Sequence, residues 1–368
     1  MDLSYSDEQR LLGESANNLL AARAQKPGAA DLWKEMADMG WLALPLPESD
    51  GGLGQGIVDV GIVTEAMGRH RARSNYVAGV VLAGGLVAAL GNDAQRAALL
   101  PGLADGSLRL ALAHAEEGAR YNLAHVAVTA KKSGAGYVLD GRKVAVLGGD
   151  VADRFILSAR ISGGTRDAGG IGLFVVAKDA RGVTVDGHAT VDGAGAARVT
   201  LAGVEVRADA LLSDNALAAI EQAYDRATAA FCSELVGLME AATKATIEYT
   251  KIRIQFGKPL AVNQALRHRM ADMSIACEEA RSMALRAALH ADDEDARSRS
   301  RAIAGAWAKV SRSARFVAEQ AIQLHGGMGV TNELEIGGYL KRVVALDAII
   351  GGPDLHLRRH AALTQHAA

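Results

Sequence analysis

Residues 251–268, KIRIQFGKPLAVNQALRH, display three side chains that could bind a ligand where one helical pattern ends and the next begins. A glycine and a proline in the middle of this stretch break the helical period and predict a tight turn. Arg253 offers a cation, Phe256 an aromatic face and Gln264 an amide, next to helix ends whose backbone groups lack helical partners. Such a corner could hold a cofactor. Alternatively, Arg253 is a solvated cation that stabilises a helix C-terminus.

A second stretch with ligand-binding character, QLHGGMG, ends a later helical pattern at residues 323–329. Beside Gln323, the glycines Gly326 and Gly327 allow a phosphate or another backbone to approach without a Cβ in the way. A glycine cap at the helix end is the simpler interpretation. Two consecutive glycines, with a third two residues later, exceed what a cap requires.

Glu234 places a carboxylate on an otherwise apolar helix face, because Ala227, Phe231 and Leu238 share that face at helical spacing. Burial without a partner would adapt this carboxylate to general acid–base catalysis. The alternative is a structural ion pair with a cation from a neighbouring helix. Both interpretations stay open from the sequence.

Two further stretches could contribute to a site. Residues 115–122, AEEGARYN, form a polar loop, and such loops often carry ligand contacts when a rigid scaffold holds them. Residues 351–356, GGPDLH, break the last helical pattern and leave Asp354 and His356 beside a chain reversal. A solvated loop and a plain turn are the alternatives.

Hydrophobic periodicity divides the chain into three parts that must position these side chains. Helical spacing predicts helices over 6–22, 30–39, 57–68, 74–90 and 93–103, with Ser6 and Gln9 as a capping box. Period-two alternation predicts strands over 126–130, 154–159, 171–176, 183–186 and 197–206, and a hairpin turn at Asp140-Gly141. Long helical patterns cover 216–252, 262–291, 295–325 and 335 towards the C-terminus. We therefore predict an α+β fold with an N-terminal helical domain (1–107), a middle β-sandwich or barrel domain (108–210) and a C-terminal four-helix bundle (211–368).

Composition excludes several classes of protein. The 368 residues carry a formal net charge of -2 and 22% charged residues, which gives no reason to expect nucleic acid or a membrane surface as partner. The two cysteines, Cys232 and Cys277, lack the spacing of a metal site or a disulfide framework. No apolar run is long enough for a membrane span, so a cytoplasmic location is the default expectation.

Four stretches together resemble the flavin-dependent acyl-CoA dehydrogenases over nearly the whole chain. They are LPESDGGLG, GYVLDGRKVAVLGGDVADRFILSAR, RIQFGKPLAVNQALRHRMADM and QLHGGMGVTNELEIGGYLKR, and they occur in the order found in that family. Two shorter pieces, EEGARYNLAHV and KVAVLGG, are most similar to the small-subunit type of pimeloyl-CoA dehydrogenase and related heteromeric enzymes.

This resemblance implies an FAD-dependent oxidoreductase that converts an acyl-CoA to a trans-2-enoyl-CoA. It also implies a dimer or tetramer, or a heteromer with a larger paralogous subunit, and an electron-transfer flavoprotein as acceptor. Carried over by motif, Arg253, Phe256 and Gln264 would contact FAD from one subunit. From the neighbouring subunit, Gln323, Gly326 and Gly327 would complete the site.

The chain departs from the family pattern around the reacting groups. Tyr121 occupies a position where a serine commonly meets the substrate, and residues 145–147, AVL, replace the Trp-Ile-Thr run that covers the flavin. The two usual positions of the glutamate base align with Gly351 and Ala227, and neither is a carboxylate.

Three hypotheses follow from these departures. The first is a dehydrogenase with Glu234 as the base and Asp354 as the second candidate. The second is a non-catalytic or half-site subunit that completes the site of a larger paralogous chain. The third is a flavin oxidase or monooxygenase on the same fold.

Overall fold

The computed structural model describes residues 4–24, 32–331 and 333–365. Contacts divide the chain into two compact units. One contains Met1–Ala29, Ile57–Arg73 and Thr228–Ala368, and the other contains Ala30–Gly56 and Ser74–Ala227. The segments of the two units alternate along the sequence, whereas the three predicted domains are consecutive. The predicted domain boundaries therefore remain a prediction. The predicted start of the second helix at Ala30 lies outside the described residues.

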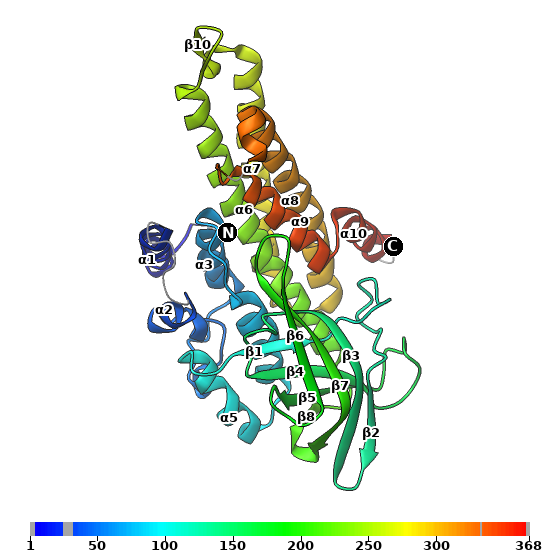
Figure 1. Cartoon of the computed structure of the whole chain (residues 1–368). Coiled ribbons are helices and arrows are strands. Elements are labelled where there is room, and N and C mark those ends of the chain that lie inside the picture. The colour runs from blue at the N-terminus through cyan, green and yellow to red at the C-terminus, as the bar shows by residue number, and fades with distance from the viewer. Residues whose placement is uncertain (1–3, 25–31, 332, 366–368) are drawn as a thin grey trace. The chain divides into compact units, whose positions relative to one another are not determined.

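The unit that contains the middle of the chain is built around a mixed sheet, eight-stranded within the described ranges (Figure 1). Its strands are β1 (Leu110–Ala113), β2 (Thr129–Ser133), β3 (Gly136–Leu147), β4 (Arg154–Arg160), β5 (Ile171–Ala177), β6 (Val183–Ala189), β7 (Gly195–Arg207) and β8 (Leu211–Ser213). The order is β6-β7-β3-β2-β4-β5-β8, and β1 pairs in parallel with β4. Apolar side chains from one face of these strands, including Leu139, Phe155 and Phe174, form its buried core. The alternating residues of the strands place that core on one side.

The same unit includes the short helices α2 (Leu32–Asp38), α4 (Gly85–Leu90) and α5 (Asp93–Ala104), and a π-helix, η3 (Val77–Gly84). Helix α5 begins with a capping box, in which the side chain of Asn92 accepts from the Gln95 backbone N–H and the side chain of Gln95 accepts from the Asn92 N–H. The first eleven residues of α6 (Leu217–Ile252) also belong to this unit by sequence.

The predicted hairpin turn at Asp140-Gly141 is wrong. Both residues lie inside β3, which runs unbroken from Gly136 to Leu147. Gly141 has a φ of 134°, at a shift in register between β3 and β7, and a Cβ there would approach Val128 within 2.9–3.3 Å. The glycine therefore permits a bulge in a strand paired on both sides, and a bulge and a turn share the same residue preference.

The other unit is helical and contains α1 (Asp7–Ala24), α3 (Ile57–Arg69), the rest of α6, α7 (Gln264–His290), α8 (Ala296–His325), α9 (Ile336–Ile350) and α10 (Pro353–Gln365). The predicted capping box of α1 is confirmed: the Gln9 N–H donates to Ser6 Oγ and the Ser6 N–H to Gln9 Oε1. The last predicted helix is divided into α9 and α10 at Gly351-Gly352. None of the helices in the described ranges combines the length and apolar character needed to cross a membrane.

Helices α3 and α6 approach each other closely through paired glycines. A Cβ on Gly68 would lie 1.9 Å from the carbonyl oxygen of Glu234, and a Cβ on Gly237 would lie 1.9 Å from that of Glu65. Each helix therefore places a glycine against the backbone of the other. This contact fixes the position of the part of α6 that carries Glu234.

Candidate functional site

Residues 251–268 fold as the predicted turn between two helices, at one end of the α6–α7 pair (Figure 1). The Arg253 N–H still donates to the carbonyl oxygen of Tyr249, 2.9 Å away, so Arg253 follows directly on the last turn of α6. A two-residue hairpin of β9 (Ile254–Gln255) and β10 (Lys258–Pro259) comes next, and Phe256 at its tip has a φ of 53°.

The three predicted ligand contacts at this turn are all exposed. Phe256 is 98% exposed, and Arg253 and Gln264 belong to the exposed class as well. Within the described part of the chain, the Arg253 guanidinium makes no ion pair. At the start of α7, Asn263 forms no side-chain cap, so backbone donors of the first turn stay available. An uncapped helix start is a ready site for an anionic group.

The second predicted stretch leaves open backbone at the end of α8. Gln323, Gly326 and Gly327 are exposed, and a Cβ on either glycine would meet no heavy atom within 4 Å. Gly326 has a φ of 61°, a conformation that favours glycine, and it begins the 3-10 helix η6 (Gly326–Val330). The cap interpretation explains Gly326 but not the open surface at Gly327.

A stacked ring pair brings the two stretches to the same end of the bundle. The rings of Tyr249 on α6 and His325 on α8 lie 4.2 Å apart at 25°, and the Tyr249 hydroxyl donates to the His325 carbonyl oxygen over 3.4 Å. Burial lowers the pKa of His325, which keeps the ring neutral against the tyrosine. One chain therefore displays both sets of predicted contacts together.

The residues present fit an extended cofactor with a flat ring and a pyrophosphate. They supply an unpaired cation at Arg253, a solvent-exposed aromatic face at Phe256, an uncapped helix start at Gln264 and glycine backbone that a phosphate can approach. Phe256 does not stabilise the chain by itself, since an exposed phenylalanine in a left-handed conformation costs free energy.

Strained backbone also occurs in the predicted substrate loop and flavin-covering run. Among the described residues, non-glycine positions with positive φ include Arg120 (47°), Tyr121 (68°) and Ala145 (48°). Tyr121 is 48% exposed, and Ala145 lies where the register of β3 shifts between Lys143 and Val146. Such conformations cluster at functional sites because the surrounding structure must hold them.

A buried polar network anchors that loop, and sequence reasoning missed it. The Lys143 ammonium donates to Glu116 Oε1 at 2.6 Å, to Ser158 Oγ at 2.8 Å and to the His114 carbonyl oxygen at 3.2 Å. Glu116 also accepts from two backbone N–H groups, at 2.6 and 3.1 Å. The sequence offered only a lysine in the run that follows Asp140-Gly141 and a glutamate in the polar loop 115–122.

Burial controls the protonation of this network. It lowers the pKa of Lys143 to about 8 and, helped by the Lys143 charge, lowers the pKa of His114 to about 3. His114 Nδ1 lies 2.9 Å from Ser158 Oγ. The histidine is therefore neutral at physiological pH, and the fully buried Lys143–Glu116 pair carries the charge.

Glu234 forms the structural ion pair that was one of its two interpretations. Its side chain lies on the helix face shared with Phe231, and the residue is 4% exposed. Arg342 of α9 donates from Nε to Oε1 at 2.6 Å and from a terminal nitrogen to Oε2 at 3.0 Å. The same guanidinium lies 5.9 Å from the centre of the Phe231 ring. The bidentate pair takes one lone pair of each oxygen, and the carboxylate serves here as the partner of a structural cation.

At the break before α10, neither Gly351 nor Asp354 supplies a buried, unpaired carboxylate. Asp354 is exposed and pairs with Arg312 at 2.6 Å. Gly351 has a φ of 102°, and its carbonyl oxygen accepts from Trp307 Nε1 at 2.7 Å. His356 is buried, with Nε2 3.0 Å from the Ile350 carbonyl oxygen. This segment is a turn whose backbone carbonyl oxygens accept hydrogen bonds from Trp307 and His356.

Three family models match consecutive parts of the chain. They are the acyl-CoA dehydrogenase N-terminal domain over residues 6–107, the middle domain over 111–204 and the C-terminal domain over 217–363. Among curated relatives, acyl-CoA dehydrogenase FadE12 of Mycobacterium tuberculosis is 31% identical over 321 residues, which is 84% of this chain and 81% of the relative. The human mitochondrial short-chain specific acyl-CoA dehydrogenase is 26% identical over 82% of this chain and 74% of its own.

Solved structures agree with these matches. A variant of the Tcur3481-Tcur3483 steroid ACAD is 30% identical with a TM-score of 0.85, covering 98% of each chain. The ChsE4-ChsE5 complex of Mycobacterium tuberculosis is 26% identical with a TM-score of 0.87 and full coverage of both chains. The predicted α+β fold, the oxidoreductase class and FAD as cofactor are confirmed at the level of the family. This chain belongs to the acyl-CoA dehydrogenase family.

Proposed function

We propose that this chain is a subunit of an FAD-dependent acyl-CoA dehydrogenase that introduces an α,β double bond into an acyl-CoA thioester. The observation that carries the proposal is the Tyr249–His325 stack, which brings the helix end before Arg253 and the open glycine backbone of residues 326–327 to the same end of the bundle. FAD, when bound, accepts the hydride that leaves the β-carbon. Electron-transfer flavoprotein is the proposed acceptor of those electrons.

The residues of this chain hold the cofactor in two sets. Arg253, Phe256 and Gln264 bind it from one subunit, and Gln323 with Gly326 and Gly327 bind it from the neighbouring subunit. Tyr121, on its strained and exposed loop, is the proposed substrate contact. The Lys143–Glu116 pair positions that loop by holding its first turn to the sheet.

A second candidate function is favoured by the missing base. Removal of the α-proton requires a positioned carboxylate, worth roughly 10²–10⁴ in rate. Gly351 and Ala227 supply none, Asp354 is exposed and Glu234 is engaged by Arg342. We infer a half-site subunit, of the small-subunit type, whose larger paralogous partner supplies the base. Similarity to the ChsE4-ChsE5 complex supports this arrangement.

The test of the cofactor proposal is flavin content and bleaching. The chain is purified alone and after co-expression with a larger paralogous chain from the same genome, and each sample is reduced anaerobically with a panel of acyl-CoA thioesters. Bound FAD that bleaches in either sample is expected. Absence of flavin and of bleaching in both samples would reject the proposed function.

The same samples separate the half-site candidate from a complete enzyme. Bleaching that requires the partner is expected, and full turnover by the lone chain would contradict the half-site role. A carboxylate-to-amide change at the base position of the partner serves as control and should abolish bleaching with flavin still bound. Stoichiometric peroxide under air would instead identify oxidase chemistry.

A further inference from the structure

The turn that follows α3 contains an arginine at a position where glycine is the usual residue. The Arg71 N–H donates to the Gly68 carbonyl oxygen at 3.2 Å, and the Ala72 N–H donates to the Met67 carbonyl oxygen at 2.9 Å. These two bonds form the Schellman arrangement that ends a helix, with Arg71 at its left-handed position and a φ of 50°. A residue with a Cβ is strained in this conformation, so the reason for an arginine here lies in what its side chain contacts.

The Arg71 side chain contacts the start of α9, far along the sequence. Its guanidinium donates to the Glu335 carbonyl oxygen at 2.9 Å and to a Glu335 carboxylate oxygen at 2.8 Å. The Cζ atom also lies 5.3 Å from the centre of the buried Tyr339 ring. The Glu335 side chain is 81% exposed, so the ion pair by itself contributes little, and the backbone and ring contacts fix the guanidinium.

A glycine in α9 makes room for this guanidinium. A Cβ on Gly338 would lie 3.0 Å from Arg71 Cζ and 3.1–3.2 Å from two of its nitrogens. These distances are shorter than normal packing allows, so a larger residue at this position would displace the guanidinium. The arginine at position 71 and the glycine at position 338 are therefore complementary in shape.

The start of α9 also packs against η6, which carries the open glycine backbone of residues 326–327. A Cβ on Gly337 would lie 3.7 Å from the Gly329 carbonyl oxygen, an ordinary van der Waals distance. On its other side, a Cβ on Gly329 would lie 2.5 Å from the Ile322 carbonyl oxygen of α8. Because η6 is packed between α8 and α9, its position depends on where α9 begins.

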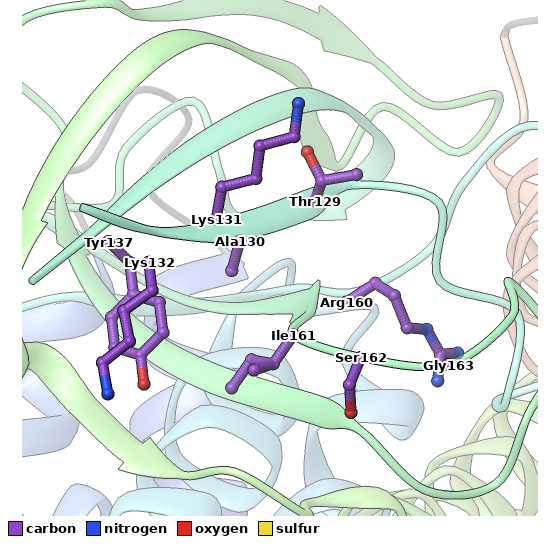
Figure 2. Close-up of a pocket in the computed structure, with 9 residues that line it drawn as sticks. All are labelled: Thr129, Ala130, Lys131, Lys132, Tyr137, Arg160, Ile161, Ser162 and Gly163. Carbon is purple, nitrogen blue, oxygen red and sulfur yellow. The ribbon is translucent and has the colours of Figure 1, made fainter.

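A buried arginine in the other unit shows what a purely structural role looks like. The Arg160 guanidinium (Figure 2) donates to five backbone carbonyl oxygens, of residues 124, 126, 165, 167 and 169. It ties the loop before β2 to the loop after β4, and the residue is 7% exposed. Arg71 has one backbone acceptor and one exposed carboxylate as its acceptors, which is a weak tie for a strained position. Its remaining effect is on the position of α9.

We propose that Arg71 is a positioning residue for the flavin. By fixing the start of α9, it keeps η6 in the conformation in which the backbone of Gly326 and Gly327 binds the cofactor. This inference rests on the proposed function, which assigns those two glycines to the flavin of the neighbouring subunit. Arg71 acts through α9, and no contact with the cofactor is assigned to it.

The dissociation constant of FAD tests the proposal. It is measured by diluting the flavin-loaded enzyme and following the fluorescence of the released flavin. Arg71→Gln should weaken FAD binding about ten-fold, as expected for the loss of charge-assisted hydrogen bonds. Arg71→Lys keeps a cation for Glu335 and Tyr339 but lacks the planar guanidinium, so it should restore part of the affinity.

Arg73→Gln is the matched control, since it removes the same charge from the same turn. Arg73 is exposed, and within the described residues it has no hydrogen bond or ion pair. The FAD affinity of this variant should stay within about two-fold of the unmodified enzyme, because only long-range attraction is lost. Equal losses in Arg71→Gln and Arg73→Gln would overturn the proposal.

Arg71→Gly separates positioning from stability. Glycine suits the left-handed position, so the free energy of unfolding in urea should be unchanged or higher. The FAD affinity should nevertheless fall as far as in Arg71→Gln. Unchanged FAD affinity, or a loss of stability in parallel with the loss of affinity, would reduce Arg71 to a structural tie between α3 and α9.

Hydrogen exchange gives a second measurement that needs no bound flavin. In the full chain as purified, Arg71→Gln should speed amide exchange in peptides that cover residues 326–331 about ten-fold and leave the middle of α8 unchanged. Equal exchange rates in the two proteins would reject the role of Arg71. Absence of FAD from the unmodified enzyme would instead reject the proposed function, so the two failures are distinguishable.

Discussion

At the level of single residues, variants of the Glu234–Arg342 pair decide whether the Glu234 carboxylate is structural or catalytic. A partly buried ion pair loses about 3–5 kcal/mol when one partner is removed, because the other charge stays buried. We expect Glu234→Ala to lower the free energy of unfolding by about 3 kcal/mol. The double variant Glu234→Leu with Arg342→Met should recover most of that loss, as measured by urea unfolding.

The rate of flavin reduction by acyl-CoA tests whether Glu234 also acts as the base. Glu234→Gln retains one acceptor for Arg342, and acyl-CoA should bleach the flavin of the assembled enzyme at a rate within about ten-fold of the unmodified protein. A loss of roughly 10²–10⁴ in the bleaching rate, with flavin and stability retained, would restore Glu234 as the base.

His114 makes stability depend on pH. Burial holds its folded-state pKa at about 3, below its ordinary value of 6.5. Between these two values the unfolded chain binds a proton that the folded chain does not, so stability falls as the pH drops through this window and is fully present above it. We expect a loss of about 1–3 kcal/mol between about pH 7 and about pH 5 that comes from this residue.

The matched variant for this effect is His114→Gln, which cannot take up the proton in the unfolded chain. Urea unfolding at the two pH values should show a flatter acid limb for the variant than for the unmodified protein. Parallel acid limbs would mean that His114 is protonated to the same extent in both states.

At the level of elements, the crossing of α3 and α6 depends on glycine. Gly237→Ala would drive a methyl group into the Glu65 carbonyl, and we expect a loss of about 2–3 kcal/mol as the helices move apart. Gly337→Ala in α9 is the control, since its Cβ would meet only one backbone oxygen at 3.7 Å. That change should be neutral or stabilising by about 0.5–1 kcal/mol.

Thermal or urea unfolding of the two alanine variants measures the difference. Equal stabilities would mean that the helices separate at no cost. Because Glu234 lies on the crossing segment, Gly237→Ala should also weaken the Arg342 contact, so the two losses should be less than additive in the combined variant.

Local sequence signals predicted some of the element boundaries. Ser6 and Gln9 identified the start of α1, and glycine with proline identified the turn between α6 and α7. Gly141 was misassigned because a bulge and a turn need the same backbone freedom, and only the pairing of β3 with β7 distinguishes them. Lys143 was missed because its carboxylate partner is 27 residues away.

At the level of the whole molecule, the proposed function assigns the two sets of predicted flavin contacts to different subunits, so that each cofactor would be shared. Arg253→Gln removes one set's cation, and Gly327→Leu places a side chain where a Cβ meets no protein atom, so both variants should fold normally. Each alone should lose most of its FAD. Mixed oligomers of the two variants contain some sites built from two intact halves.

Co-expression of these variants with different affinity tags tests the sharing. Tandem purification of a mixed dimer should recover about half of the normal flavin per dimer, because one site combines the intact sets and the other combines both defects. Absence of recovery would mean that both sets serve the same subunit's flavin. The sharing between subunits is expected from the family resemblance, and the identity of the partner depends on a second chain and is not encoded locally.

For the candidate site, too, the sequence predicted features that depend on neighbouring residues and missed those that depend on distant ones. The stretches around Arg253 and Gly326 could be found because their residue types are unusual at helix ends. Glu234 could be placed on an apolar face, but its role depended on Arg342, which lies 108 residues later and reaches it only through packing. Pairings over such separations are decided by the fold rather than by local spacing.

The turn at Gly351 also constrains how this chain can change over time. With a φ of 102°, its backbone adopts a conformation that a residue with a side chain rarely occupies, and Trp307 and His356 bond the carbonyl oxygens on either side of the bend. A glutamate at Gly351 would either adopt this strained conformation or distort the bend that the two hydrogen bonds hold. A single substitution would therefore supply a carboxylate at this turn without a backbone conformation suited to aim it, and the half-site function proposed above needs no acid at this position.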